Sequence, residues 1–238
     1  MTTPLDSHSK QYSHLGGTTP EVIDRLIISE LCKGWPMYRD NSEWANFRSM
    51  FTDDAHIWTT WSTNCQIDEF IKISKQGKAN GAFIMHRENS TLVELNQQSQ
   101  RAVGKMKATI TQRFQTTQDG TSSPLIYDID CDCRYIFFCK KDAAHEGDWK
   151  VQFVKIIYEK DKVCSVDGTS VPHFSSEELS KYPDGYRYLG AAQARLGHRI
   201  NTQLATLREP YWSKMYECME NWLDGHDDPG LFWEHQQE

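Results

Sequence analysis

Two residues of this sequence, His86 and Asp40, have the side chains that acid/base chemistry needs. A carboxylate beside a buried imidazole fixes the tautomer of the ring and stabilises its protonated form, so the ring exchanges a proton near neutral pH. Such a pair can remove a proton next to a carbonyl group and return it elsewhere, which serves elimination, isomerisation and ring closure. This chemistry requires neither a metal nor a nucleotide.

Each of these residues also has a structural interpretation. His86 could be a hydrogen-bonded residue of the core. Asp40 stands three positions before Glu43, which is the pattern of an N-cap for a helix that begins near Trp44. Glu88 adds a second carboxylate near His86 and is a reserve candidate for a base.

Alternation along two expected strands predicts which other side chains face a pocket. In the segment 128–139, Tyr135 shares its face with apolar residues, while Asp128 to Arg134 carry charges on the other face. Tyr135 is therefore a candidate hydrogen-bond donor to a substrate oxygen, or an inward tyrosine with a core partner. The inward face contains Ile129, Cys131, Cys133, Tyr135 and Phe137. Cys131 and Cys133 on one strand form a poor zinc pattern, and we interpret them as small buried hydrophobes.

The segment 102–114 has its apolar residues on the face of Met106. This alternation points Gln112 into the pocket end and leaves the neighbouring Thr111 on the solvated face with the lysines. A β-bulge would reverse that placement. His56, on the strand expected at 55–61, should point away from the cavity.

Composition limits the kind of partner. A chain of 238 residues with 38% hydrophobic residues can bury a substantial core. A formal charge of −7 argues against nucleic-acid or anionic-membrane surfaces, which need clustered cations. The chain has no apolar run of about 18 residues and no apolar segment near its N-terminus, which predicts a cytoplasmic protein. Its seven scattered cysteines predict reduced thiols.

Helical patterns precede strand patterns along the chain. Thr18 to Glu21 opens a helix whose apolar stripe should lie on the core, and Pro36 kinks or ends it. That stripe comprises Val22, Ile23, Leu26, Ile27 and Leu31. A second helix carries Trp44. It is followed by a strand at 55–61, a short helix at 67–74 and a His-bearing loop that leads to and includes 83–86. Strands are then expected at 91–95, 102–114, 127–139 and 149–158, and helices at 185–196 and 207–222. This order predicts an α+β fold in which helices cover one face of a curved antiparallel sheet.

Three units are expected along the chain. Residues 1–17 form a polar, flexible arm, residues 18–164 form the core domain, and residues 165–238 form a helical extension that packs on the domain or on a dimer partner. The extension is apolar enough to require a docking surface.

The motif order resembles the SnoaL-like branch of the nuclear-transport-factor-2-like superfamily. The runs Asp40 to Trp44, Phe51 to Ala55 and Met85-His86 are similar to the D-x-x-x-W, F-T-D-D-A and His motifs of that branch. The resemblance covers residues 20 to 160 and implies a cone-shaped curved sheet. That branch includes scytalone dehydratases, polyketide cyclases and isomerases, so the resemblance implies a lyase or isomerase.

The resemblance also implies residue roles. Asp40 and His86 match the pair that moves a proton in scytalone dehydratase, so His86 would transfer the proton, Asp40 would orient it, and Tyr135 would polarise a substrate oxygen. Two positions depart from the scytalone dehydratase pattern. Thr111 stands where that enzyme has a second pocket histidine, and Thr59 or Trp58 stands where it has a tyrosine. Scytalone itself is therefore not implied as the substrate. The walls of the substrate pocket would come from Trp58, Trp61, Phe83, Met106, Gln112, Cys133, Phe137 and Phe153.

The resulting hypothesis is a cofactor-independent, metal-free lyase or isomerase, dehydratase-like or cyclase-like. Its substrate would be a small apolar oxygenated metabolite, and the family resemblance implies a polyketide or terpenoid of secondary metabolism. The same resemblance implies a homodimer or homotrimer. The alternative is a non-catalytic small-molecule-binding or dimerisation module of the same fold.

Overall fold

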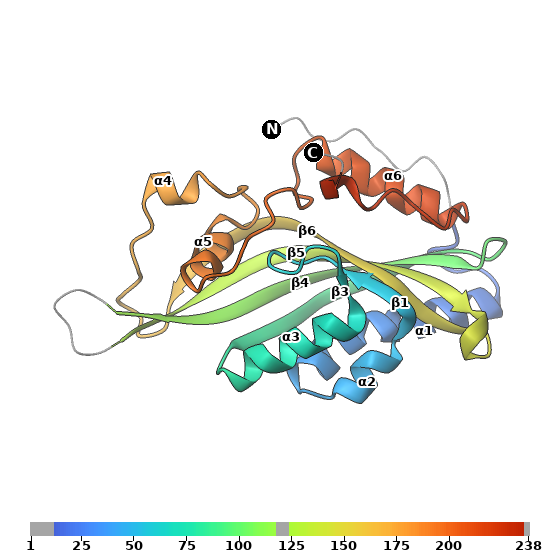
Figure 1. Ribbon diagram of the computed structural model, residues 1–238. Helices are drawn as coiled ribbons and strands as arrows, with labels where there is room; N and C mark the ends of the chain where they lie inside the picture. The colour runs from blue at the N-terminus through green and yellow to red at the C-terminus, as the bar shows by residue number, and fades with distance from the viewer. Residues whose placement is uncertain (1–11, 118–123, 236–238) are drawn as a thin grey trace.

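The computed structural model describes residues 12–117 and 124–235, which form one six-stranded sheet with helices on both faces (Figure 1). Residues 1–11 of the expected arm lie outside the described residues. The strands are β1 (Phe51–Ile57), β2 (Cys65–Gln66), β3 (Phe83–Asn96), β4 (Arg101–Thr116), β5 (Leu125–Asp142) and β6 (Asp148–Ser165). The helices are α1 (Thr19–Gly34), the π-helical turn η1 (Trp35–Arg39), α2 (Trp44–Ser49), α3 (Ile67–Ala79), α4 (Ser176–Leu179), α5 (Arg187–Arg195) and α6 (Tyr211–Leu223), with 3₁₀ turns η2 (Ala143–His145) and η3 (Trp233–His235).

The sheet confirms the expected α+β class. Its order is β2-β1-β6-β5-β4-β3, in which β3 to β6 form an antiparallel meander and β1 runs parallel to β6. Burial alternates along β5, so that Tyr135 faces inward and Arg134 faces outward. Thr111 of β4 points to the face opposite Gln112, where it is buried and its hydroxyl donates to Asp130 of β5. Alternation therefore assigned both strands correctly.

Local sequence explains how the first helices reach the sheet. Thr18 and Glu21 form a capping box at the start of α1, and Pro20 occupies its first turn. Pro36 cannot donate a backbone hydrogen bond, and the chain widens there into the π-helical turn η1. Trp35 and Arg39 of this turn are both buried, so the turn directs two large side chains toward the sheet.

Two expectations about local structure are wrong. Most of the α1 stripe faces outward, since Val22, Ile23, Leu26 and Ile27 are exposed and only its last member, Leu31, packs against the core. Ile28 and Cys32 are the fully buried residues of the helix. Helical periodicity gave the spacing of an apolar face, but the helix docks through the neighbouring face. The His-bearing loop is instead part of β3, which continues from Phe83 to Asn96 with an irregularity between Glu88 and Ser90.

The segment after β6 packs on both faces of the sheet. Helix α6 lies on the face opposite α1, α2 and α3 (Figure 1), and its Trp222 indole donates to the backbone oxygens of Ala102 and Cys139. Helix α5 instead reaches the inward face, where Gln193 hydrogen-bonds Gln112 of β4. The cavity described below is therefore bordered by both early and late segments.

Two further sequence expectations concern thiols and membranes. All seven cysteines are free, as expected. No helix in the described ranges is long and apolar enough to cross a membrane.

Close packing between α1 and β4 generates a stability prediction at Gly104. A Cβ atom added there would overlap Cys32 Sγ of α1. We expect Gly104→Ala to lower the free energy of unfolding by about 1–3 kcal/mol, because α1 or β4 must shift to admit the methyl group.

Gly77→Ala is the matched control, since its added Cβ would meet only Ala82 Cβ at 3.9 Å. It lies inside α3, where alanine should stabilise the helix by about 1 kcal/mol relative to glycine. Chemical denaturation of both variants measures the two effects. Equal stability of Gly104→Ala and the wild type would contradict the described contact of α1 with β4.

Candidate active site

The central feature of the candidate site is a hydrogen-bonded pair formed by Asp40 and His86. Asp40 Oδ1 lies 2.7 Å from His86 Nδ1, and Asp40 Oδ2 accepts a hydrogen bond from the His86 backbone N–H at 2.6 Å. Asp40 follows directly after η1, and His86 lies on the inward face of β3. Residues remote in sequence therefore meet where the first helical segment ends against the sheet.

This geometry decides between the two interpretations of Asp40. The N-cap of α2 is Glu43, and it makes no side-chain cap hydrogen bond. Both carboxylate oxygens of Asp40 contact His86 instead. The N-cap interpretation of Asp40 is therefore wrong.

Burial controls the protonation of His86. His86 is 8% exposed, and the loss of water around the imidazole lowers its pKa below the ordinary value, although the hydrogen bond to Asp40 opposes this shift. The ring is therefore neutral near pH 7. With Nδ1–H donating to Asp40, the lone pair is on Nε2, which is the atom that can accept a proton.

A small cavity, here called the inner cavity, lies against His86 and has a volume of about 30 Å³. Tyr135 borders it, with its ring centroid 5.9 Å from that of His86. Burial raises the pKa of the Tyr135 phenol well above its usual value, so the hydroxyl stays protonated and can donate a hydrogen bond. An imidazole nitrogen with a lone pair and a protonated hydroxyl donor therefore border one small cavity.

Helix α5 closes the inner cavity through Gln193, whose amide side chain pairs with that of Gln112 on β4. Gln193 Nε2 donates to Gln112 Oε1 at 2.8 Å, and Thr60 Oγ1 donates to Gln193 Oε1 at 2.5 Å. The carbonyl oxygen of Gln112 is thereby engaged, which makes its amide N–H group the end available to a bound molecule. Leu189 of α5 adds an apolar wall.

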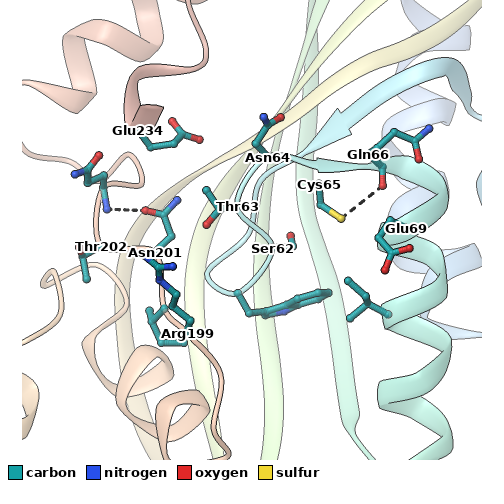
Figure 2. A pocket seen from close by; sticks show the side chains of 14 residues that line it. Ser62, Thr63, Asn64, Cys65, Gln66, Glu69, Arg199, Asn201, Thr202 and Glu234 are labelled. Carbon is teal, nitrogen blue, oxygen red and sulfur yellow. Dashed lines mark hydrogen bonds between the residues drawn. The ribbon is translucent and has the colours of Figure 1, made fainter. Parts of the chain in front are cut away.

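Two further spaces share lining residues with the inner cavity. The middle cavity, of about 70 Å³, shares Arg39, Gln112 and Gln193 with the inner cavity. The outer cleft, of about 840 Å³, runs between residues 62–66, α3 and residues 199–203 (Figure 2). Trp61 borders all three spaces and stacks on Phe70 with ring centroids 5.5 Å apart.

The structure brings together some, not all, of the expected pocket residues. Trp61, Gln112, Tyr135 and His86 border the inner cavity, and Asp40 lies behind His86. Met106, Cys133 and Phe137 face inward but are buried in the core rather than bordering the cavities.

Three expected wall residues lie elsewhere and require correction. Phe83 is 47% exposed, with the Arg113 guanidinium over its ring, because its neighbour Ile84 takes the inward position on β3. Trp58 and Phe153 pack with Phe232 of the C-terminal segment. Trp58 follows the end of β1, where strand alternation no longer applies.

The reserve base Glu88 and the strand residue His56 do not border the cavities. Glu88 is exposed and accepts a hydrogen bond from Thr91 at 2.6 Å. His56 has its ring centroid 6.2 Å from that of Phe232, away from the inner cavity as expected.

Sequence reasoning missed several residues that border the cavities. Arg39 borders the inner and middle cavities, His198 borders the middle cavity, and Gln193 borders both. Arg39 precedes Asp40, and an arginine next to an aspartate usually indicates a solvated pair. Gln193 and His198 come from the tail, and no local pattern relates them to a strand far earlier in the chain.

Comparison with known proteins decides the family. The sequence model of the SnoaL-like domain matches residues 20–155. The chain belongs to the SnoaL-like family. The matched range includes Asp40, His86 and Tyr135 but not Gln193, so this SnoaL-like protein completes its cavity with a residue from outside the matched range.

Relatives share most of the chain. A PEP2-like protein of Fusarium vanettenii is 38% identical over 93% of this chain and 95% of its own length. Pea pathogenicity protein 2 of the same organism is 38% identical, covering 86% of this chain and 87% of its own length. A protein of Aspergillus terreus is 40% identical over 81% of this chain and 73% of its own length.

Solved structures with a similar fold are more distant in sequence. A candidate scytalone dehydratase from Novosphingobium aromaticivorans is 11% identical, with a TM-score of 0.47, over 63% of this chain and 97% of that chain. A hexachlorocyclohexane dehydrochlorinase, LinA-type3 from Novosphingobium barchaimii, is 13% identical, with a TM-score of 0.45, over 64% of this chain and 97% of that chain.

The pair predicts a specific titration of His86. Burial lowers its folded pKa below 6.5 and Asp40 partly offsets this, so Asp40→Asn should lower the pKa further. NMR titration of the ring, assigned with His86→Asn, measures both values. A His86 pKa that is unchanged by Asp40→Asn would contradict the coupling.

The same shift predicts how stability depends on pH. Above pH 6.5 His86 is neutral in the folded and unfolded chains, and its contribution to stability is fully present. As pH falls from 6.5 toward the folded pKa, only the unfolded chain takes up this proton, so that contribution is lost. The pH dependence of the free energy of unfolding should therefore be weaker in His86→Asn than in the wild type across this window.

Proposed function

We propose that this SnoaL-like protein is a cofactor-independent lyase or isomerase that acts on a small, largely apolar, oxygenated metabolite. His86 is the proton-transfer residue, Asp40 orients it, and Tyr135 donates a hydrogen bond to a substrate oxygen. The observation that supports this most directly is the 2.7 Å contact between Asp40 Oδ1 and His86 Nδ1 beside an enclosed cavity.

The geometry suits abstraction of a proton next to a carbonyl group. Neutral His86 accepts the proton on Nε2 while Asp40 holds Nδ1–H, and the electron pair of the broken C–H bond moves onto the carbonyl oxygen to give an enolate. The protonated ring then returns the proton. Delivery to a neighbouring hydroxyl group releases water in a dehydration, whereas delivery to another carbon completes an isomerisation.

The cavities indicate the size of the substrate. The inner cavity alone admits about two or three water molecules, at roughly 10–15 Å³ for each. A substrate whose reacting carbon lies near His86 must therefore extend into the middle cavity, past Ile84 and Trp61, which border both. These mostly apolar walls favour a hydrophobic body with few polar groups.

The biological setting of the proposal rests on resemblance. A polyketide or terpenoid of secondary metabolism, handled in the cytoplasm, fits the branch to which the motifs are similar. One relative is named for pathogenicity on pea, and we propose that it and this chain share a small-molecule reaction. The expected homodimer or homotrimer also stays a prediction, which the mass in solution by light scattering tests.

Hydrogen exchange tests the proposed reaction without a known substrate. A panel of small cyclic ketones and β-hydroxy ketones is incubated in D₂O with the protein, and deuterium uptake or water loss is followed by mass spectrometry. We expect His86→Asn to lower the enzyme-dependent rate by about 10²–10⁴-fold, the usual contribution of a general base. Asp40→Asn should lower it less, because it changes the orientation of the ring and not the base itself.

His145→Asn is the matched control. His145 Nδ1 lies 2.8 Å from Asp142 Oδ2, so it forms a similar histidine–aspartate pair, but on the β5–β6 connection away from the cavities. Its rate should equal that of the wild type. If ligands bind but no variant changes exchange or water loss, a non-catalytic binding module replaces the proposal.

A further inference from the structure

Arg39 is a buried cation whose donors are not satisfied. The residue is 5% exposed, and its Nε and Nη1 atoms have no hydrogen-bond partner in the described parts of the chain. The nearby carboxylate of Asp40 does not meet this need, since Oδ1 lies 3.9 Å from Nη1. Both Asp40 oxygens already accept hydrogen bonds from His86.

An arrangement of this kind is costly for the folded chain. A guanidinium group keeps its charge in proteins, so it cannot avoid the cost of burial by losing a proton. Buried charges are normally paired and hydrogen-bonded. A long, misaligned contact with Asp40 compensates only part of the lost hydration, and unmet donors remain.

The guanidinium is held in place by aromatic rings. It lies 5.8 Å from the ring centroid of Trp35 and 5.5 Å from that of Phe70. Cation–π attraction at these distances fixes its position without using its N–H groups. The donors of Arg39 are therefore positioned by packing and stay available at the border of the inner and middle cavities.

Neighbouring groups favour a negatively charged occupant. Trp35 Nε1 and Ser74 Oγ are also buried without a hydrogen-bond partner among the described residues, and they border the inner and the middle cavity respectively. Lys78 borders the middle cavity, where its ammonium group donates to the backbone oxygen of Asp40. Cationic side chains and N–H donors thus outnumber acceptors on this side of the cavities.

We propose that Arg39 binds an oxygen anion of the substrate, so that it is the oxyanion-binding residue of the site. This inference rests on the proposed function and specifies its substrate class: a molecule with a carbonyl oxygen that becomes an enolate oxygen, or with a carboxylate. In the enolate case, proton transfer from carbon to His86 Nε2 creates one positive and one negative charge, and Arg39 stabilises the negative one.

Small aromatic probes test the inference without a known substrate. 4-Nitrophenol changes its absorption spectrum on ionisation, so binding and protonation state are read together at a pH below its own pKa. We expect the wild type to bind the ionised form, and Arg39→Met to weaken that binding at least about tenfold, the scale of a charge-assisted hydrogen bond. Arg39→Lys, which keeps the charge, should lie between them.

Matched controls separate the charge of Arg39 from general effects. Arg113→Met removes an arginine that pairs with Asp128 on the outer face at 2.8 and 2.9 Å, and binding should not change. Nitrobenzene, a neutral probe of similar shape, should bind wild type and Arg39→Met equally. Unchanged 4-nitrophenolate binding in Arg39→Met, or absence of ionised 4-nitrophenol on the wild type, overturns the inference.

Benzoate, measured by displacement of 4-nitrophenol, separates the two sources of the anion. Benzoate binding tighter than 4-nitrophenolate, with the advantage lost in Arg39→Met, indicates a carboxylate on the substrate. Tighter binding of 4-nitrophenolate indicates an oxygen that becomes charged during the reaction. Either order supports an anion site, provided that Arg39→Met removes it.

Stability distinguishes a functional from a structural arginine. If Arg39 is kept for ligand binding, Arg39→Met removes an under-compensated buried charge and should raise the melting temperature. A lower melting temperature of Arg39→Met together with unchanged 4-nitrophenolate binding in the same variant would make Arg39 a structural residue and overturn the inference.

The exchange assay keeps this inference separate from the proposed function. If His86→Asn abolishes exchange while Arg39→Met changes neither exchange nor 4-nitrophenolate binding, the inference fails and the proposed function stands. If Arg39→Met loses 4-nitrophenolate binding but no ketone exchanges with any variant, the anion site stands and the proton-transfer proposal fails.

Discussion

The paired hydrogen bonds between Asp40 and His86 constrain the arrangement around the cavity. Because Asp40 accepts from both the ring and the backbone of His86, the end of η1 is held in a defined position against β3. Arg39 immediately precedes Asp40, so the same contact places its guanidinium at the cavity border. Asp40 Oδ1 stays 3.9 Å from Arg39 Nη1. The same interaction therefore orients the His86 ring, while Nε and Nη1 of the neighbouring Arg39 have no hydrogen-bond partner among the described residues.

Enclosure of the site depends on the late part of the chain. The inward faces of β3, β4 and β5 supply His86, Gln112 and Tyr135, but Leu189 and Gln193 of α5 supply the remaining wall. Gln193 connects Thr60 with Gln112, which ties the tail to the β1–β2 connection and to β4. Exclusion of water by this wall lowers the pKa of His86 and strengthens every charge interaction beside it. The tail thus completes the surroundings of three side chains that lie within the matched range.

Strand periodicity carried most of what the sequence could predict. It assigned Tyr135 and Gln112 to the inward face, because alternation on a long strand leaves few choices once one residue is placed. Strand periodicity failed for Trp58, which follows the end of β1. Helical periodicity failed for α1, because an apolar stripe does not say which side of a helix docks. Neither pattern could find Gln193, since contact between α5 and β4 is set by packing of the whole fold. Motif order predicted that Asp40 and His86 form a pair, whereas the two hydrogen bonds between them could be identified only in the structure.

Arg39 shows why a buried charge is informative only after the fold is known. In the sequence it is one of 26 basic residues and stands beside an acidic one, which is typical of a solvated surface. In the structure it is surrounded by Trp35 and Phe70, with N–H groups that no described residue accepts. A hydrophobic side chain of similar volume would fill that space at lower cost in stability. Retention of the cation in such a place is explained by an anionic partner, and the adjoining cavities supply the space in which that partner would lie beside the base.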